Sequence, residues 1–228
     1  MWSRLVSCAL ARRSLALRSP PGPLRDYYRA AAPRFDLPYT AAEFLAVDIE
    51  TTGLDPRADA IVSIGFVPIV SGRVVLARAG HHLVRPDRPM RAEAVKIHGL
   101  TDEALAAAAP LAEALPPLLA ALAGRVAVAH HAPLERAFLA RACRSVYGAP
   151  LAAPWICTLA LAKRRFARAD APIGEGELRL ATCRARLGLP HRRAHDALSD
   201  ALAAAELFLA QAALASGRAP ARLRDLLT

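Results

Sequence analysis

Two carboxylates stand at the end of an apolar run that has the pattern of a buried strand. The run FLAVDIE, residues 44–50, is apolar on both faces at its start, which is typical of a strand inside a sheet. Alternate residues of a strand point to the same face, so Asp48 and Glu50 are predicted to lie side by side. Two like charges at this spacing are stable mainly when they are solvated or when a cation lies between them. The stretch therefore indicates either a metal site or a solvated acidic turn.

Further runs of residues predict a sheet that mixes antiparallel strands with strands separated by helices. IVSIGFVPIV and RVVLARAGHHLV are expected as two strands joined by a hairpin turn at Ser71 and Gly72. RVAVAH and WICT are expected as two more short strands. Helices are expected over AEAVKIHGL, TDEALAAA with Thr101 as N-cap, residues 111–122, APLERAFLARACRSVYG, LALAKRRF and DALSDALAAAELFLAQAALA. The pattern predicts an α/β fold with a central, mixed, five-stranded sheet flanked by helices.

Length and charge bound the domain organisation. A chain of 228 residues can form one well-cored domain with appendages. Residues 1–40 contain seven arginines but only Asp26 and Asp36 as acids, so we expect a basic N-terminal extension there, a folded domain over 41–215 and a short tail over 216–228. The Arg- and Ser-rich opening fits either an organelle transit peptide or an arginine-biased amphipathic extension.

The overall composition favours a polyanionic partner and gives no sign of a membrane span. The net charge is +10, although only two of the 30 basic residues are lysines, which indicates an arginine bias. Every apolar stretch of spanning length is interrupted by a charge, a proline or a glycine. The four cysteines form no C-x-x-C pair. We expect a cytoplasmic protein without a membrane partner.

Two later segments supply further acids that could join the first pair. Glu135 falls in the first turn of a predicted helix that directly follows a buried strand, a position that also suits the helix dipole. His195 and Asp200 are five positions apart, about 140° around a helix, so they cannot share a helical face. If Asp196 caps the helix, His195 lies on the preceding loop and both side chains could converge on one spot. Asp196 itself, one turn before Asp200, is a competing ligand.

Taken together, these motifs resemble the DEDDh family of 3′–5′ exonucleases, which includes the proofreading epsilon subunit of bacterial DNA polymerase III and ribonuclease T. The resemblance runs from Phe44 to Leu209 through Asp-x-Glu-Thr-Thr-Gly, the acid of H-x-x-L-E-x-x-F-L, and His-x4-Asp. The segment KIHGLTDEAL also looks like the family's. The resemblance implies a ribonuclease-H-like fold and two divalent cations, Mg²⁺ or Mn²⁺. It implies these residue roles: Asp48, Glu50, Asp200 and Glu135 as metal ligands, His195 as general base, and Thr51, Thr52, Gly53, Leu54 and His98 around the terminal nucleotide.

The implied activity is hydrolysis of single-stranded or frayed DNA from its 3′ end, with release of nucleoside 5′-monophosphates and a polymerase as a possible partner. The short tail favours a stand-alone repair or turnover enzyme. One alternative is a 3′–5′ exoribonuclease acting on RNA or short oligonucleotides with the same site. Another is a catalytically weakened nucleic-acid-binding or polymerase-associated module, because Glu135 stands where the family commonly has Asp.

Overall fold

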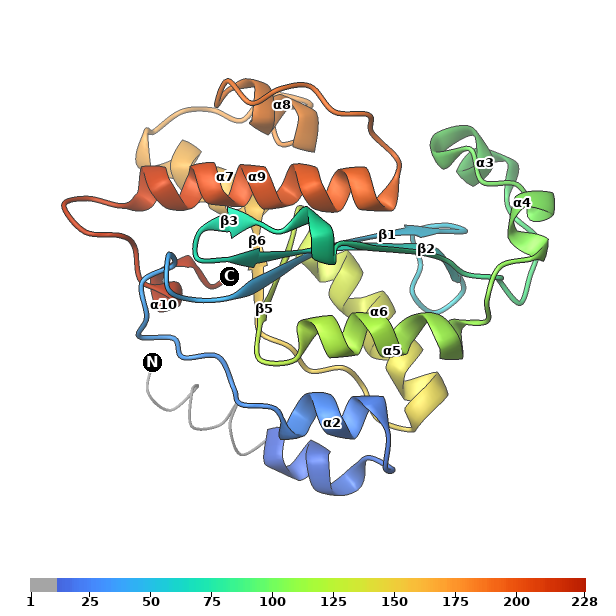
Figure 1. The fold of residues 1–228 in the computed structure, drawn as a ribbon. Coiled ribbons are helices and arrows are strands. Elements are labelled where there is room, and N and C mark those ends of the chain that lie inside the picture. The colour runs from blue at the N-terminus through green and yellow to red at the C-terminus, as the bar shows by residue number, and fades with distance from the viewer. Residues whose placement is uncertain (1–11) are drawn as a thin grey trace.

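The computed structural model describes residues 12–228, which build a mixed six-stranded sheet with helices on both faces (Figure 1). The strand order is β3-β2-β1-β5-β6, with β4 also paired to β2. β1 runs antiparallel to β2 and parallel to β5, and β5 runs parallel to β6, so the predicted mixed α/β sheet is confirmed. The strands are β1 (Phe44–Thr51), β2 (Ile61–Val70), β3 (Arg73–Val74), β4 (Gly80–Leu83), β5 (Val126–Ala129) and β6 (Trp155–Cys157).

The sheet has six strands rather than the expected five because the segment after the hairpin turn is split in two. Val74 pairs with Ile69, and Gly80 pairs with Phe66. Gly80 is six positions after Val74, but their partners on β2 are only three positions apart. The extra residues loop out and include a 3₁₀ turn, Leu76–Arg78, before pairing resumes as β4. The register of strand pairing depends on tertiary contacts, and these cannot be read from the sequence of one apolar segment.

The helices predicted from the sequence are present, and the structure adds three more. Thr101 caps its helix by accepting a hydrogen bond from the backbone N–H of Ala104, and Gly148 ends another with a left-handed φ of 73°. The helices are α2 (Pro23–Arg29), α3 (Ala92–His98), α4 (Asp102–Ala106), α5 (Leu111–Leu122), α6 (Ala132–Tyr147), α7 (Thr158–Arg168), α8 (Leu180–Ala185), α9 (Ala197–Ala215) and α10 (Leu223–Leu226). Of these, α2, α8 and α10 are the ones not predicted from the sequence.

Alternate residues of β1 supply two separate cores. Leu45 and Val47 pack with α5 and α6 on one face of the sheet. Phe44 packs with α9 on the other face, its ring 4.7 Å from that of Phe208. Because side chains of a strand alternate in direction, Asp48 continues the row of Phe44 and points to the face that α9 covers.

Helix α9 is the only helix of the described part of the chain that is long and apolar enough to cross a membrane by length and composition. It lies along the sheet, however, and contributes small and apolar side chains, among them Leu207 and Phe208, to the cores (Figure 1). Its apolar character is therefore accounted for by packing inside the domain.

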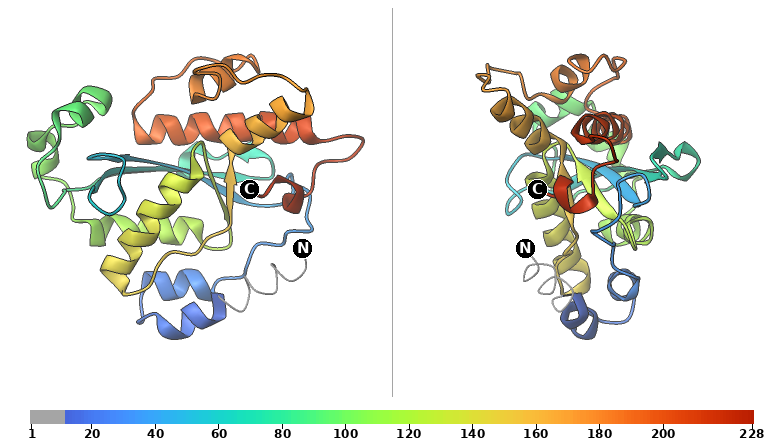
Figure 2. Two further views of the ribbon diagram at one scale, coloured as in Figure 1. Left: turned by 180° about the vertical axis from the view of Figure 1, so that it is seen from behind. Right: turned by 90° about the vertical axis from the view of Figure 1, so that its left-hand side faces the viewer.

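Segments expected as an extension and a tail also bury side chains. Tyr27 and Tyr28 of α2 join the α5 core, and the Tyr28 hydroxyl donates a 2.5 Å hydrogen bond to the carbonyl of Pro150. Leu223 and Leu226 of α10 join the α9 core. Figure 2 shows α2 below the sheet and α9 above it. The domain boundaries at residues 40 and 215 stay a prediction, and the first residues of the transit-peptide-like opening, 1–11, lie outside the described residues.

Gly65 sets how closely α9 approaches the sheet. It lies on β2 directly opposite Asp48 of β1. A Cβ atom at Gly65 would stand 2.1 Å from the carbonyl carbon of Ala197, in the first turn of α9, so only glycine leaves room for the helix backbone there. The absence of a side chain at Gly65 therefore fixes the start of α9 beside the end of β1.

We predict that Gly65→Ala lowers the free energy of unfolding by about 1–3 kcal/mol, because the added methyl group must displace the first turn of α9. Urea denaturation followed by circular dichroism measures the change. The matched control is Gly217→Ala, where a new Cβ meets nothing within 4 Å. Equal stability of the two variants would show that α9 does not rest on the sheet at Gly65.

Candidate metal centre

Three carboxylates from distant parts of the chain meet above the end of β1. One oxygen each of Asp48, Glu50 and Asp200 lies within 4.8 Å of the others. Glu50 and Asp200 are about 150 residues apart in sequence, and α9 brings them together. An all-oxygen, all-anionic group of this size is the donor set that Mg²⁺ and Mn²⁺ prefer. The interpretation of the Asp48 and Glu50 pair as a solvated turn is disfavoured, because a third acid faces the pair.

Asp196 serves as the helix cap of α9. Its Oδ1 accepts a 2.8 Å hydrogen bond from the backbone N–H of Ser199, which occupies one of its two oxygens. Asp196 is not a member of the group of three, although its charge still acts on Glu50 and Asp200. Of the two acids that the sequence leaves in competition, Asp200 is the one that faces the end of β1.

Burial, with the crowding of like charges second, makes the cluster hard to ionise. Burial, followed by the charges of Glu135 and Asp200, raises the pKa of Asp48 well above its ordinary range, although part of its surface reaches solvent. Burial and then the charge of Asp200 raise the pKa of Glu50 to about 7. Burial also raises the pKa of Asp200, against the effect of a hydrogen bond from the backbone of His195. A bound cation would reverse each of these effects by favouring the charged carboxylates.

Glu135 lies beside Asp48 but outside the group of three. It stands in the first turn of α6, is only 4% exposed, and burial raises its pKa to about 8. Its Oε2 is buried and has no hydrogen-bond partner among the described residues. A buried carboxylate oxygen without a partner is costly, so this oxygen fits a role as ligand to a cation or to a group that a cation holds.

His195 lies on the loop before α9, as the sequence predicts. It has a left-handed φ of 63°, a conformation that histidine adopts more readily than most residues. Its backbone N–H donates a 2.7 Å hydrogen bond to Oδ2 of Asp200. The side chain of His195 is exposed, so the imidazole stands next to the acids and remains open to solvent.

The turn after β1 divides into residues that face outward and residues that face the interior. The Thr51 hydroxyl donates to the carbonyl of Gly53 at 2.6 Å, and Leu54 is 77% exposed. Thr52 instead is buried, with its hydroxyl 3.2 Å from Oδ1 of Asp59. The His98 ring, from α3, lies beside the backbone of Thr51, and burial lowers its pKa. Thr51 and His98 therefore lie beside the end of β1 that carries the acids, Leu54 is exposed on the turn, and the Thr52 side chain is buried against Asp59.

Asp59 was not found by sequence reasoning, yet it holds this turn in shape. Its side chain is 1% exposed and accepts a 2.9 Å hydrogen bond from the backbone N–H of Asp55. It also pairs with Arg91, the residue before α3, at 3.1 Å. A Cβ at Gly53 would stand 2.5 Å from the Asp59 carboxylate, so the glycine is required by this packing. The only sequence signal is an acid directly before an apolar strand, which is common on protein surfaces.

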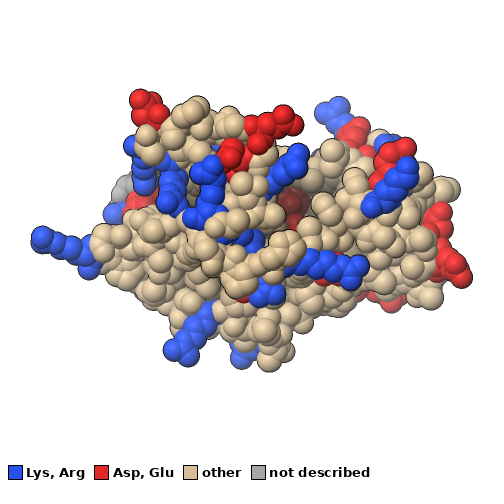
Figure 3. All heavy atoms as spheres, turned by 90° about the horizontal axis from the view of Figure 1, so that it is seen from above, with Lys and Arg blue, Asp and Glu red and all other residues tan. Residues whose placement is uncertain are grey.

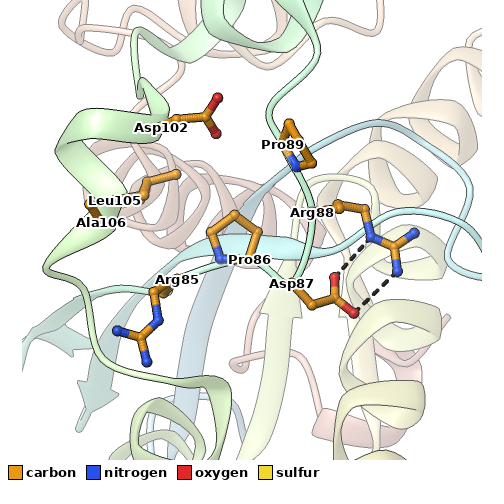
Figure 4. A pocket seen from close by; sticks show the side chains of 8 residues that line it. All are labelled: Arg85, Pro86, Asp87, Arg88, Pro89, Asp102, Leu105 and Ala106. Carbon is orange, nitrogen blue, oxygen red and sulfur yellow. Dashed lines mark hydrogen bonds and ion pairs between the residues drawn. The ribbon is translucent and has the colours of Figure 1, made fainter.

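The pair of Asp59 and Arg91 ties the turn to an arm formed by α3 and α4, residues 91–106, which projects from the sheet (Figure 1). Residues 85–89 connect β4 to this arm beside a cavity of about 340 Å³ (Figure 4). Asp87 and Arg88 pair with each other there, and none of the clustered acids lines this cavity. Seen from above, acidic atoms lie inside a hollow between the arm and the part that carries α8 and α9 (Figure 3). The site is thus open to a ligand from that side.

Comparisons with known proteins agree with this arrangement. Residues 45–208 match the RNase T family, which is described as exonuclease. The DNA polymerase III PolC-type of Thermotoga petrophila is 35% identical over 175 residues, 77% of this chain and 12% of that protein. The DNA polymerase III subunit epsilon of Treponema pallidum is 32% identical over 165 residues, 72% of this chain and 74% of that protein. The chain therefore spans a small part of the PolC-type polymerase and most of the epsilon subunit.

A solved structure of exonuclease X in complex with 5′-overhanging duplex DNA has the same fold. It is 28% identical, with a TM-score of 0.60, and the match covers 80% of this chain and 98% of that one. The ribonuclease-H-like fold implied by the sequence is confirmed by this likeness together with the mixed sheet.

The raised pKa values predict how pH and Mn²⁺ affect stability. Without metal, an acid whose pKa is higher in the folded than in the unfolded protein stabilises the fold at low pH, and this stability is lost as pH rises through the folded value. With folded values of about 7 for Glu50 and about 8 for Glu135, the melting temperature of the metal-free protein is expected to fall between about pH 5 and pH 8. Mn²⁺ binds the ionised acids, so it is expected to raise the melting temperature more at pH 8 than at pH 5.

Differential scanning fluorimetry with and without Mn²⁺ measures both effects. Glu135→Gln is expected to flatten the pH dependence, whereas Asp36→Asn, at an exposed acid paired with Arg34, serves as the control and should leave it unchanged. A Mn²⁺ effect that is the same at both pH values, or that survives in Asp48→Asn, would contradict a cation site in this cluster.

Proposed function

The chain belongs to the RNase T family of exonucleases, and on this premise we propose that it is a 3′–5′ exonuclease that hydrolyses single-stranded or frayed 3′ ends of DNA with the help of two divalent cations. The observation that carries the proposal is the meeting of Asp48, Glu50 and Asp200 within 4.8 Å, with Glu135 beside them. Carboxylates this close together and this buried lower the stability of a protein unless they bind positive charge.

The metal ligands are assigned from the positions of the four acids. Asp48, Glu50 and Asp200 would hold one cation, and Asp48 together with Glu135 would hold the second, either ion being Mg²⁺ or Mn²⁺. The unpartnered Oε2 of Glu135 supports its role, because an additional methylene relative to Asp still leaves a free oxygen at the site. When bound, two such ions neutralise the phosphate and stabilise the attacking and leaving oxygens of an in-line displacement.

His195 acts as the general base. Its ring is exposed at the rim of the cluster, and its backbone is held by Asp200, which keeps the loop against the first turn of α9. The imidazole accepts a proton from the attacking water as the water oxygen bonds to phosphorus. The bond from phosphorus to the 3′ oxygen then breaks, the 3′ oxygen takes a proton from solvent, and a nucleoside 5′-monophosphate leaves.

The turn after β1 receives the terminal nucleotide. The exposed side chain of Leu54 offers an apolar surface to the base, while the side of Gly53 where a side chain would stand is filled by the Asp59 carboxylate. Thr51 and His98 border the same space. Thr52 does not touch the nucleotide; its hydroxyl bonds to Asp59, which holds the turn in shape. The ion pair between Asp59 and Arg91 then links the turn to the arm.

The names of similar proteins favour DNA over RNA as the substrate. Two relatives are subunits or segments of DNA polymerase III, and the solved exonuclease X structure holds duplex DNA. The same relatives make a replicative DNA polymerase a candidate partner of this chain. The excess of positive charge supports binding to the phosphate backbone in either case.

Loss of one shared ligand tests the site and the substrate together. Asp48→Asn keeps the size of the side chain but removes the charge between both proposed cations, so the rate with Mn²⁺ is expected to fall by at least about 100-fold. The assay compares labelled single-stranded DNA and RNA of the same sequence, and Asp36→Asn is the control. Unchanged activity of Asp48→Asn would remove the site from the mechanism, and faster cleavage of RNA would overturn the choice of DNA.

The role of His195 has a separate test. His195→Ala is expected to lower kcat by about 10²–10⁴-fold, since a positioned general base contributes that much. Added imidazole should restore part of the rate, whereas the Mn²⁺-dependent rise in melting temperature should remain. A variant with normal kcat, or one that also loses the Mn²⁺ effect, would contradict a role confined to proton transfer.

A further inference from the structure

A groove at the far end of α9 lies apart from the acidic cluster. It has a volume of about 550 Å³ and is walled by α7, the segment after α8, the end of α9 and α10. Leu214 lies 14 residues after Asp200, which places it about 21 Å along the helix axis. This α7–α9 groove shares no residue with the proposed catalytic site, so neither metal binding nor hydrolysis accounts for it.

Arginines form the rim of the α7–α9 groove. Two of them are held in place: Arg164 donates to the carbonyl of Leu227 at 2.7 Å, and Arg186 pairs with Glu177. Arg165 and Arg168 are exposed, and their side chains form no ion pair or hydrogen bond among the described residues. Basic side chains gather over this end of the upper face (Figure 3). The groove also contains one acid, Asp225, which lies 3.8 Å from Arg224, so the four arginines of the lining outnumber it and the rim offers net positive charge to a ligand that carries negative charge.

The lining of the groove is aliphatic rather than aromatic. Leu161 and Leu187 contribute to it, and Leu214 stands on its edge with 58% of its surface exposed. The one aromatic residue, Phe166, has a face covered by the guanidinium of Arg186, 5.1 Å from the ring centre. Single-stranded nucleic acids are held largely by stacking of bases on free aromatic faces. The groove thus suits aliphatic side chains better than bases.

Gln211 ties two walls of the groove together. Gln211 also lines it and lies three residues before Leu214, on the same side of α9. Its Nε2 donates a 2.9 Å hydrogen bond to the carbonyl of Thr158, which fixes the amide, and its Oε1 is buried without a partner among the described residues. Because this oxygen is shut off from solvent, Gln211 holds α9 against the start of α7 and leaves ligand contacts to the rim and the aliphatic lining.

We propose that the α7–α9 groove docks an acidic peptide segment of a partner protein, with its aliphatic side chains on Leu187 and Leu214 and its carboxylates on Arg165 and Arg168. Apolar anchors inside a groove with complementary charges at the rim are the usual basis of peptide docking. This surface adds partner recruitment to the nuclease, and its test does not depend on nuclease activity.

The test is fluorescence anisotropy with the full-length protein and a labelled peptide that combines four glutamates with three leucines. Binding is expected to saturate and to weaken as salt is raised. Arg165→Glu combined with Arg168→Glu should weaken it about tenfold or more, and Leu214→Ser should weaken it several-fold. The matched control carries the same charge reversal at two exposed arginines outside the groove, Arg73→Glu and Arg144→Glu. This control should bind the peptide as tightly as the unchanged protein does.

Three results would overturn the proposal. One is the absence of saturable binding by the acidic peptide. Another is equal loss of binding in the control with Arg73 and Arg144 reversed, which would mean that only net charge matters. The third is that reversal of Arg165 and Arg168 weakens binding of a labelled oligothymidylate but not of the peptide, which would make the groove a nucleic-acid surface. Circular dichroism of each variant confirms that it is folded.

Discussion

Repulsion between carboxylates at the end of β1 is the constraint on which the rest of this structure depends. Asp48 is surrounded by Glu50, Glu135 and Asp200, and each of these acids has a raised pKa because it is partly or fully removed from water. A fold gains nothing in stability by bringing such groups together without counter-charge. Their convergence is therefore understood as the cost of a cation site, and the surrounding elements are arranged to keep the acids in position.

The same packing that forms the core also forms the site. One row of β1 begins with Phe44 against α9 and ends with Asp48 and Glu50, so the strand that anchors the helix also carries the first two ligands. Gly65 lets the helix backbone rest on the sheet, and Asp200 in the first turn is thereby held over β1. Because the N-terminus of a helix carries partial positive charge, the start of α9 also favours the nearby carboxylates when they ionise.

Local patterns predicted the first pair of acids and the fold class, because strand alternation and helix capping are short-range properties. The period of two places Asp48 and Glu50 on one face without further information. Helix periodicity alone leaves Asp196 and Asp200 in competition, since both fit one turn of the same helix. The family resemblance favours Asp200, and the cap hydrogen bond that Asp196 accepts from the Ser199 N–H agrees with that choice. The burial of Asp59 depends on Arg91, which is 32 residues away and joins it only in the folded chain. The break between β3 and β4 likewise follows from pairing register.

The most direct test of the cation site is anomalous X-ray diffraction from crystals soaked with Mn²⁺ and thymidine 5′-monophosphate. The account predicts two anomalous peaks, one among Asp48, Glu50 and Asp200 and one between Asp48 and Glu135, separated by about 4 Å as in two-metal nucleases. A crystal that binds the nucleotide yet shows no manganese at these acids, or shows it only at other residues, would contradict the account.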